Sequence, residues 1–228
     1  MRRIGVIKVM SYKLRMRFSK TGTAKYISHL DLISTMIRVM RRAGIELKYS
    51  EGFNPHPYLS VALPLPVGCG STCELMDFGT LHELLPDGLP EIINAVMPEG
   101  LYVQEIYPPE SRFSDVAWVE TAITLHYGAA DLHRVSEGLY RRFTAGIMNI
   151  RKKTKRGLSE LDIAPFIRDI EISCSDVVLL TAKLSAQNPS VTPENLLSLL
   201  DTAEPGLFPD FSSFCRTQVF DCNLRVFR

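Results

Sequence analysis

The residues best suited to chemistry in this 228-residue chain lie within residues 26–74. His29 directly follows Ser28, a favourable N-cap residue, so the pattern predicts that it lies in the first turn of a helix. Free backbone N–H groups of such a turn attract anions, and an imidazole there can transfer protons or contact a phosphate. His29 is therefore a candidate catalytic residue with Lys25 and Tyr26 beside it, and a histidine of the hydrophobic core is the alternative.

The helix predicted over residues 28–42 carries a stripe of arginines. At 100° per residue its apolar face comprises Leu30, Ile33, Ile37 and Met40. The opposite face gathers Asp31, Ser34, Thr35, Arg38, Arg41 and Arg42. A guanidinium group suits bidentate recognition of phosphate or carboxylate, so the candidate ligand-binding residues here are Asp31, Arg38, Arg41 and Arg42. Alternatively, the arginines only cap and solubilise the helix.

Prolines constrain the segment that follows, residues 52–57. Pro55 and Pro57 fix their own φ and favour extended conformations at the residues before them, which displays Phe53, Asn54 and His56 in fixed directions. Aromatic, amide and imidazole groups held in this way suit base stacking and polar recognition, and a purely structural loop is the alternative. A second constrained turn at residues 64–71 has glycines that permit close backbone approach. Ser71 at its end and Glu74 beyond it are further candidate ligand-binding residues.

A second basic feature lies far along the chain, where residues 151–156 contain five bases in six positions. Such a run can bind a nucleic-acid backbone, and a solvated loop is the alternative. The candidate nucleic-acid-binding residues are therefore Lys25, Arg151, Lys152, Lys153, Lys155 and Arg156.

No metal or cofactor is expected. The five histidines have no tight metal-ligand spacing with the cysteines. Cys69 and Cys73 match the first part of the CX3CX2C iron–sulfur motif of radical-SAM enzymes, but Met76 occupies the position of the third cysteine. The sequence has no Walker-type, GxGxxG or GxSxG element in a strand–turn–helix context, which argues against the commonest nucleotide-binding and hydrolase sites.

The composition is that of an ordinary globular protein, with 46% hydrophobic and 22% charged residues. No apolar run approaches the roughly 20 residues needed to span a bilayer, and no signal peptide is evident, so we expect a cytoplasmic protein without membrane contact. The five scattered cysteines are expected to be free thiols.

The net charge of +1 hides a polarity along the chain. Residues 1–50 contain twelve Lys or Arg and two acids, whereas residues 74–120 contain ten acids and one base. This balance is typical of a protein that offers one face to a phosphate-rich or acidic partner. Two solvated faces that partly neutralise each other are the alternative.

Hydrophobic periodicity predicts two similar series of elements. The first has strands at 12–19, 45–49, 59–63, 73–79 and 101–107 and helices at 28–42 and 89–96. The second has strands at 119–126, 147–150, 166–173, 177–184 and 215–227 and helices at 131–143 and 193–200. We therefore predict an α+β fold of two tandem ferredoxin-like (βαββαβ) modules, residues 11–109 with the site and residues 115–228.

Several of these motifs together resemble a known family. YISHLDL at 26–32, RRAG at 41–44, YSEGFNPHP at 49–57 and PLPVG at 64–68 are similar to the radical-SAM-associated domain family of unknown function, found alone or fused to B12-dependent radical-SAM proteins. The resemblance is dense over residues 18–77 and weaker beyond. It implies a radical-SAM enzyme as a partner in trans and supplies no catalytic residue. A looser, architectural resemblance is to CRISPR repeat-processing endoribonucleases.

Three functions are compatible with these patterns. The leading one is a non-catalytic module that presents RNA to a radical-SAM enzyme, with the candidate residues of segments 29–42 and 53–56 converging on one basic pocket. The second is a metal-independent endoribonuclease in which His29 is the general acid or base and Arg38 or Lys25 stabilises a phosphate charge. The third is an adaptor that docks a protein on the acidic 74–120 surface. The oligomeric state is not predicted.

Overall fold

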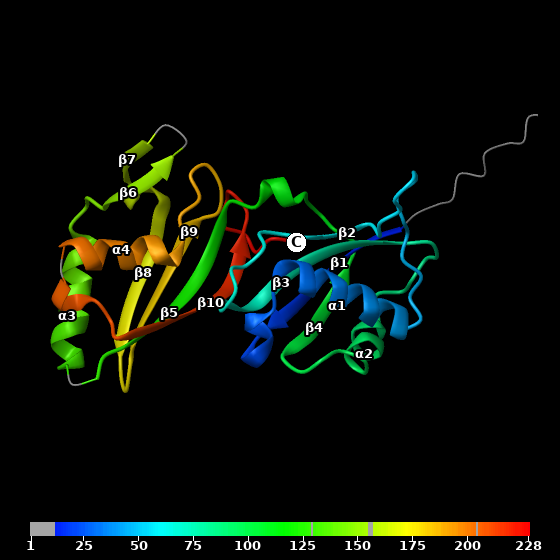
Figure 1. Ribbon diagram of the computed structural model, residues 1–228, viewed down its shortest axis with the longest axis horizontal. Helices are drawn as coiled ribbons and strands as arrows, with labels where there is room; N and C mark the ends of the chain where they lie inside the picture. The colour runs from blue at the N-terminus through cyan, green and yellow to red at the C-terminus, as the bar shows by residue number, and fades with distance from the viewer. Residues whose placement is uncertain (1–11, 129, 155–156, 204) are drawn as a thin grey trace, which may run out of the picture. The chain divides into compact units, whose positions relative to one another are not determined.

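The chain folds into two compact units, which we describe from a computed structural model (Figure 1). The structure describes residues 12–128, 130–154, 157–203 and 205–228. Unit 1 comprises residues 1–112 and Arg228, and unit 2 comprises residues 113–227. Both units combine helices with antiparallel strands, so the predicted α+β class is confirmed.

Unit 1 has the order β1 (Tyr12–Lys20), η1 (Gly22–Tyr26), α1 (His29–Arg42), β2 (Leu59–Val61), β3 (Gly70–Thr80), α2 (Leu89–Asn94) and β4 (Leu101–Tyr107). Its strands are arranged β4-β1-β3-β2, and every neighbouring pair is antiparallel. Met16 of β1 lies opposite Met76 of β3 on one side and Ile106 of β4 on the other. This register aligns the hydrophobic positions of the three strands on one face of the sheet.

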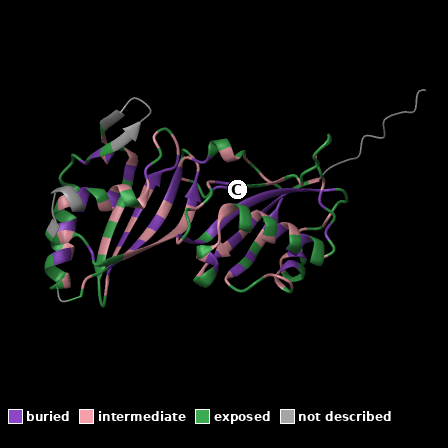
Figure 2. Ribbon diagram, in the orientation of Figure 1, coloured by how far each residue is buried: buried purple, intermediate pink, exposed green. Residues whose placement is uncertain are grey.

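That face and the two helices form the core of unit 1. The sheet contributes Leu14, Met16, Phe18, Met76, Phe78 and Val103, and the helices contribute Leu32, Met36, Val39, Met40, Leu89 and Ile93. Figure 2 shows β3 buried along nearly its whole length, in agreement with its burial pattern. The core therefore fixes both helices against the same face of the sheet.

Helix α1 begins and ends where the sequence predicts. The Ser28 Oγ accepts a hydrogen bond of 3.2 Å from the Asp31 N–H, and Gly44, with φ +73°, follows the last turn. The predicted apolar face, however, is largely wrong: of its four residues only Met40 is buried, Ile33 and Ile37 are half-buried, and Leu30 is 75% exposed. The buried face consists of Leu32, Met36, Val39 and Met40, at the i, i+4, i+7 and i+8 spacing of a helix stripe.

Two predicted strands differ in the structure. Residues 45–49 form no strand and make only single bridges, Leu47 to Thr80 and Tyr49 to Pro57, because β2 occupies the adjoining edge of β3. The last strand ends at Phe220 rather than at residue 227. The Asp221 carboxylate accepts hydrogen bonds from the N–H groups of Asn223 and Arg225, and this turn reverses the chain.

Unit 2 follows a similar order, with one hairpin added. Its elements are η2 (Phe113–Asp115), β5 (Trp118–His126), α3 (Leu132–Thr144), β6 (Asn149–Thr154), β7 (Gly157–Asp162), η3 (Ala164–Phe166), β8 (Ile167–Cys174), β9 (Val178–Ser185), α4 (Pro193–Ala203), η4 (Pro205–Leu207) and β10 (Phe211–Phe220). Four strands are arranged β10-β5-β9-β8, all antiparallel, and β6 pairs only with β7. Strand β7 was not predicted, because its sequence GLSELD has little hydrophobic alternation.

The basic run lies on this hairpin. Arg151 is exposed on β6, and Lys152 and Lys153 follow it in the same strand. Lys155 and Arg156 lie outside the described residues. Within the described part of the chain, no helix combines the length and the apolar character required to cross a bilayer.

Candidate functional site

Part of the basic start of the chain is neutralised inside unit 1. The fully buried Arg15 of β1 binds Asp77 of β3 through two bonds, Nε to Oδ1 at 2.6 Å and Nη2 to Oδ2 at 3.0 Å. Lys13 adds a contact of 2.8 Å to Asp77 Oδ2. The charge polarity of the sequence therefore reflects in part the pairing of a basic strand with acidic neighbours.

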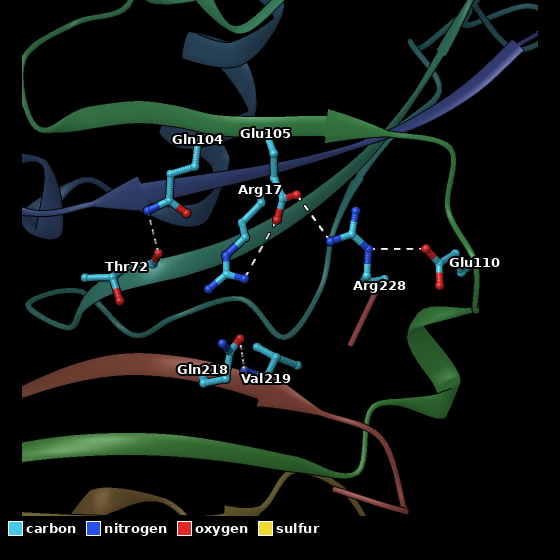
Figure 3. Close-up of polar contacts among 8 residues, drawn as sticks. All are labelled: Arg17, Thr72, Gln104, Glu105, Glu110, Gln218, Val219 and Arg228. Carbon is cyan, nitrogen blue, oxygen red and sulfur yellow. Dashed lines mark hydrogen bonds and ion pairs between the residues drawn. The ribbon is translucent and has the colours of Figure 1, made fainter. Parts of the chain in front are cut away.

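A second set of ion pairs involves β4. Arg17 Nη1 lies 3.8 Å from Glu105, and Arg228 contacts Glu105 at 3.3 Å and Glu110 at 3.2 Å (Figure 3). The Arg228 guanidinium also lies 4.3 Å from the centroid of the Tyr107 ring. Because Glu74 and Asp77 are buried and Glu105 and Glu110 are paired, at least four of the ten acids in residues 74–120 are engaged or enclosed rather than free on an acidic surface.

A cleft of about 490 Å³ lies in unit 1 beside the edge of β3. We call it the Lys48 cleft. Its lining includes Tyr12, Lys13, Lys48, His56, Tyr58 and Asp77. The cleft is thus lined by two lysines, a histidine and two tyrosines. Asp77, which also lines it, is already paired with Lys13 and Arg15.

Three backbone hydrogen bonds bring the key residues of the cleft together. The Lys48 N–H donates to Gly79 O, the Gly79 N–H to Tyr58 O and the Tyr58 N–H to Lys48 O, each at 2.8 Å. A Cβ on Gly79 would lie 3.3 Å from Tyr58 Cβ and 3.5 Å from Lys48 Cβ, so the glycine makes room for both side chains. The Lys48 Nζ then lies 5.2 Å from the centroid of the Tyr58 ring. This geometry holds a cation beside an exposed aromatic ring.

Ser50 holds His56 in the wall of the cleft. Ser50 Oγ accepts the His56 backbone N–H at 3.1 Å and lies 2.9 Å from His56 Nδ1, while the Ser50 N–H donates to His56 O at 2.8 Å. The serine hydroxyl can donate its own proton to Nδ1, which leaves the proton of the neutral imidazole on Nε2. His56 can then offer an N–H donor to an acceptor in the cleft.

A second hollow lies on the other side of residues 44–49. We call it the Arg41 groove. It measures about 530 Å³ and is lined by Ile37, Arg41, Ile45, Glu46, Leu47, Tyr49 and Leu81 together with Gly44. The His82 Nε2 lies 3.0 Å from Glu46 Oε2, and because a carboxylate only accepts, the imidazole donates.

His29, which is half-buried, lines a different and much smaller cavity of about 10 Å³, together with Lys20, Ser28, Leu32 and Glu74. Lys20 is 2% exposed and its Nζ donates to Lys25 O at 3.0 Å. Burial lowers the pKa of Lys20 from its ordinary value, and the Glu74 carboxylate partly offsets that effect. A space of this size holds no more than one water molecule.

The predicted site residues are therefore distributed over three places. His56 belongs to the Lys48 cleft, Arg41 to the Arg41 groove, and His29 and Glu74 to the small cavity. Helix α1 has 14 residues and is about 21 Å long, so His29 and Arg42 lie at its opposite ends. The pocket expected from the sequence, with all of these residues together, is not what the structure shows.

The remaining predicted residues lie mainly on the surface of unit 1. Phe53 is fully exposed, Tyr26 is 61% exposed with Lys25 Nζ 5.1 Å from its ring centroid, and Ser71 is buried. The exposed set also includes Asp31, Arg38, Arg42 and Asn54. Asp31 takes part in the N-cap of α1, since its carboxylate accepts the Ser28 hydroxyl at 2.7 Å.

Sequence reasoning missed four residues of the cleft: Tyr12, Lys13, Lys48 and Tyr58. No local pattern marks Lys48 or Tyr58, because the hydrogen bonds of distant segments at Gly79 bring them together beside His56. A group of three or more His, Cys, Asp or Glu side chains that could hold a metal ion is absent from the described residues.

Comparison with known proteins gives a family without an assigned activity. One glutamyl-tRNA(Gln) amidotransferase polypeptide of Rhizobium meliloti (strain 1021) is 33% identical over 88 residues, which is 37% of this chain and only 18% of that polypeptide. A crystal structure of a Cbf5-Nop10-Gar1 complex matches 90% of this chain and 48% of that chain with a TM-score of 0.48 and 9% identity, too distant to bear on function.

The family model that matches residues 13–193 is described as an uncharacterized protein conserved in bacteria. That description names no radical-SAM enzyme, so this association stays a prediction. Because the match covers most of the sequence, the chain belongs to the DUF2344 family of uncharacterized bacterial proteins.

Proposed function

We propose that unit 1 is a non-catalytic module that binds single-stranded RNA in the Lys48 cleft. The observation that carries the proposal is the convergence at Gly79, where Lys48 and Tyr58 lie side by side in a cleft that also contains His56 and Lys13. Proteins that bind single strands combine cations, which contact phosphates, with aromatic rings, on which bases stack.

Each group in the cleft has a role in this proposal. Tyr58 is 48% exposed and offers a face for a base, and Lys48 beside it offers a charge for the adjacent phosphate. His56 donates its Nε2–H to a phosphate or base oxygen. The cleft volume, about 490 Å³, is in the range of small-molecule sites and suits one nucleotide.

The architecture is part of the proposal. The arrangement β4-β1-β3-β2 in unit 1, and β10-β5-β9-β8 in unit 2, supports two ferredoxin-like modules over residues 11–109 and 115–228. In this proposal the second module carries the β6–β7 hairpin as an insertion, and Arg151 there is a further nucleic-acid contact.

We further propose that the module presents RNA to a radical-SAM enzyme in trans, in the cytoplasm. This step rests on the resemblance of residues 26–68, and it predicts that the two proteins bind each other directly. Sedimentation of this chain with purified candidate radical-SAM enzymes, with and without RNA, tests it.

The two other functions have less support. An endoribonuclease with His29 as its acid or base needs room for a phosphodiester, and the cavity at His29 measures about 10 Å³. An adaptor that uses the acidic 74–120 segment would have to do so without Glu74 and Asp77, which are buried, and with Glu105 and Glu110 already paired.

Fluorescence anisotropy with a labelled single-stranded RNA tests the RNA proposal. Tyr58→Leu should raise the Kd about tenfold, since one stacked base contributes ~1–3 kcal/mol. Lys48→Gln should lower the slope of log K against log salt by about 0.7, the value for one phosphate contact on a single strand. Arg134→Gln on the exposed surface of α3 is the control. Absence of binding by the wild-type protein, or equal binding by all variants, would refute the proposal.

A further inference from the structure

The Arg41 groove has the same kinds of groups as the Lys48 cleft. Tyr49 is 41% exposed and lines it, and the exposed Arg41 lies on its rim. Arg38 precedes Arg41 by one helical turn and is also exposed. Apolar side chains, among them Ile45 and Leu47, form the floor.

The groove and the cleft are adjacent in the backbone. Lys48 lines the cleft, whereas its two neighbours Leu47 and Tyr49 line the groove. The alternation follows from the extended backbone here, which is held by the bridges Leu47 to Thr80 and Tyr49 to Pro57. The cleft and the groove are therefore separated by this single extended segment, around which a bound strand would have to pass.

The charges of the groove suit the same ligand. Arg41 provides a planar cation for a phosphate, and no basic group of the cleft has to be shared with it. The one carboxylate in the lining, Glu46, accepts a hydrogen bond from His82. Its second oxygen offers an acceptor to an exocyclic amine of a base.

We infer that the Arg41 groove is a second nucleotide subsite, in which a base lies against Tyr49 and Arg41 binds its phosphate. The inference rests on the proposed function, because the first nucleotide of the same strand occupies the Lys48 cleft. It specifies the ligand as an RNA strand of at least two nucleotides, and it gives the arginine stripe of α1 a role in binding the strand beyond the cleft.

Binding of a mononucleotide and of a short oligonucleotide by the same variants separates the two subsites. The probes are fluorescently labelled AMP and a labelled (rA)4, and the measurement is the Kd at several salt concentrations. Tyr49→Leu should raise the Kd for (rA)4 about tenfold and leave that for AMP unchanged. Arg41→Gln should lower the salt slope for (rA)4 by about 0.7 and again leave AMP unchanged.

The controls distinguish failure of the inference from failure of the proposed function. Lys48→Gln should weaken both probes, Arg134→Gln neither, and circular dichroism should give every variant the wild-type melting curve. If wild type binds both probes but Arg41→Gln and Tyr49→Leu change neither, the groove serves another ligand class, such as an apolar peptide with an acidic end, and the inference is overturned. If wild type binds neither probe, the proposed function itself fails.

Discussion

Removal of the Asp77 carboxylate should destabilise unit 1 strongly. Asp77 is 4% exposed and provides both acceptor oxygens for the fully buried guanidinium of Arg15. In Asp77→Ala the Arg15 charge stays buried, with the Ser111 carbonyl at 2.9 Å still accepting one of its bonds. Breaking a buried pair in this way costs about 3–5 kcal/mol, a large part of the ~5–15 kcal/mol that stabilises an ordinary domain.

A double substitution shows whether the cost comes from the uncompensated charge. Arg15→Met with Asp77→Leu removes both charges and fills similar volumes with apolar groups, which avoids the desolvation penalty. The double variant should therefore recover most of the stability that Asp77→Ala loses. Asp87→Ala, which removes an exposed carboxylate of the same unit, is the matched control and should change the free energy of unfolding by less than about 0.5 kcal/mol.

Urea unfolding followed by far-UV circular dichroism measures these differences, and hydrogen exchange of peptides from β1 and β3 assigns them to unit 1. The single tryptophan, Trp118, lies in β5, so its fluorescence reports on unit 2 separately. A loss below about 1 kcal/mol in Asp77→Ala, or a double variant no more stable than the single one, would refute the reasoning.

Three further predictions concern single groups. Burial lowers the pKa of Lys20 in the folded protein below its ordinary value of 10.5, so between the folded and the unfolded pKa the unfolded chain binds more protons than the folded one. The free energy of unfolding should therefore rise with pH in this range. Lys20→Met should remove that rise, which urea midpoints at several pH values measure. Burial raises the pKa of Tyr127 from 10.0 to about 12, so the free energy of unfolding should fall between pH 10 and pH 12 in wild type and fall less in Tyr127→Phe. Absorbance at 295 nm should show the ionisation of the Tyr127 phenol at this raised pH. Gly79→Ala should weaken RNA binding severalfold in the anisotropy assay by separating Lys48 from Tyr58, whereas Gly206→Ala, with open space around it, should not.

Local patterns predicted the helices and most strands well. The N-cap at Ser28 and the glycine after α1 gave that helix its bounds, because capping depends on neighbouring residues. Strands β8 and β9 likewise lie close to the strands predicted at residues 166–173 and 177–184. Strand β7 and the end of β10 were not predicted. Strand β7 depends on its pairing with β6, and the end of β10 depends on the turn that the Asp221 carboxylate stabilises.

The candidate site was predicted less well than the elements that carry it. His56, Arg41 and most of the constrained loop at residues 52–57 lie at the surface of unit 1, and their role in ligand binding stays a prediction, whereas their predicted grouping with His29 is not seen. Hydrophobic periodicity also failed to predict that Leu30 is exposed and that Glu74 is buried. A helical projection gives relative angles between side chains and does not say which side meets the sheet.

The sequence by itself determined the α+β class, the span of α1, and the presence of basic and aromatic residues around residues 38–58. Only the tertiary structure decided which of those residues meet. Lys48, Tyr58 and Gly79 are joined by hydrogen bonds between segments up to 31 residues apart, and Arg15 finds Asp77 across 62 residues. Such contacts depend on strand register, which the whole core sets, and so no local pattern contains them.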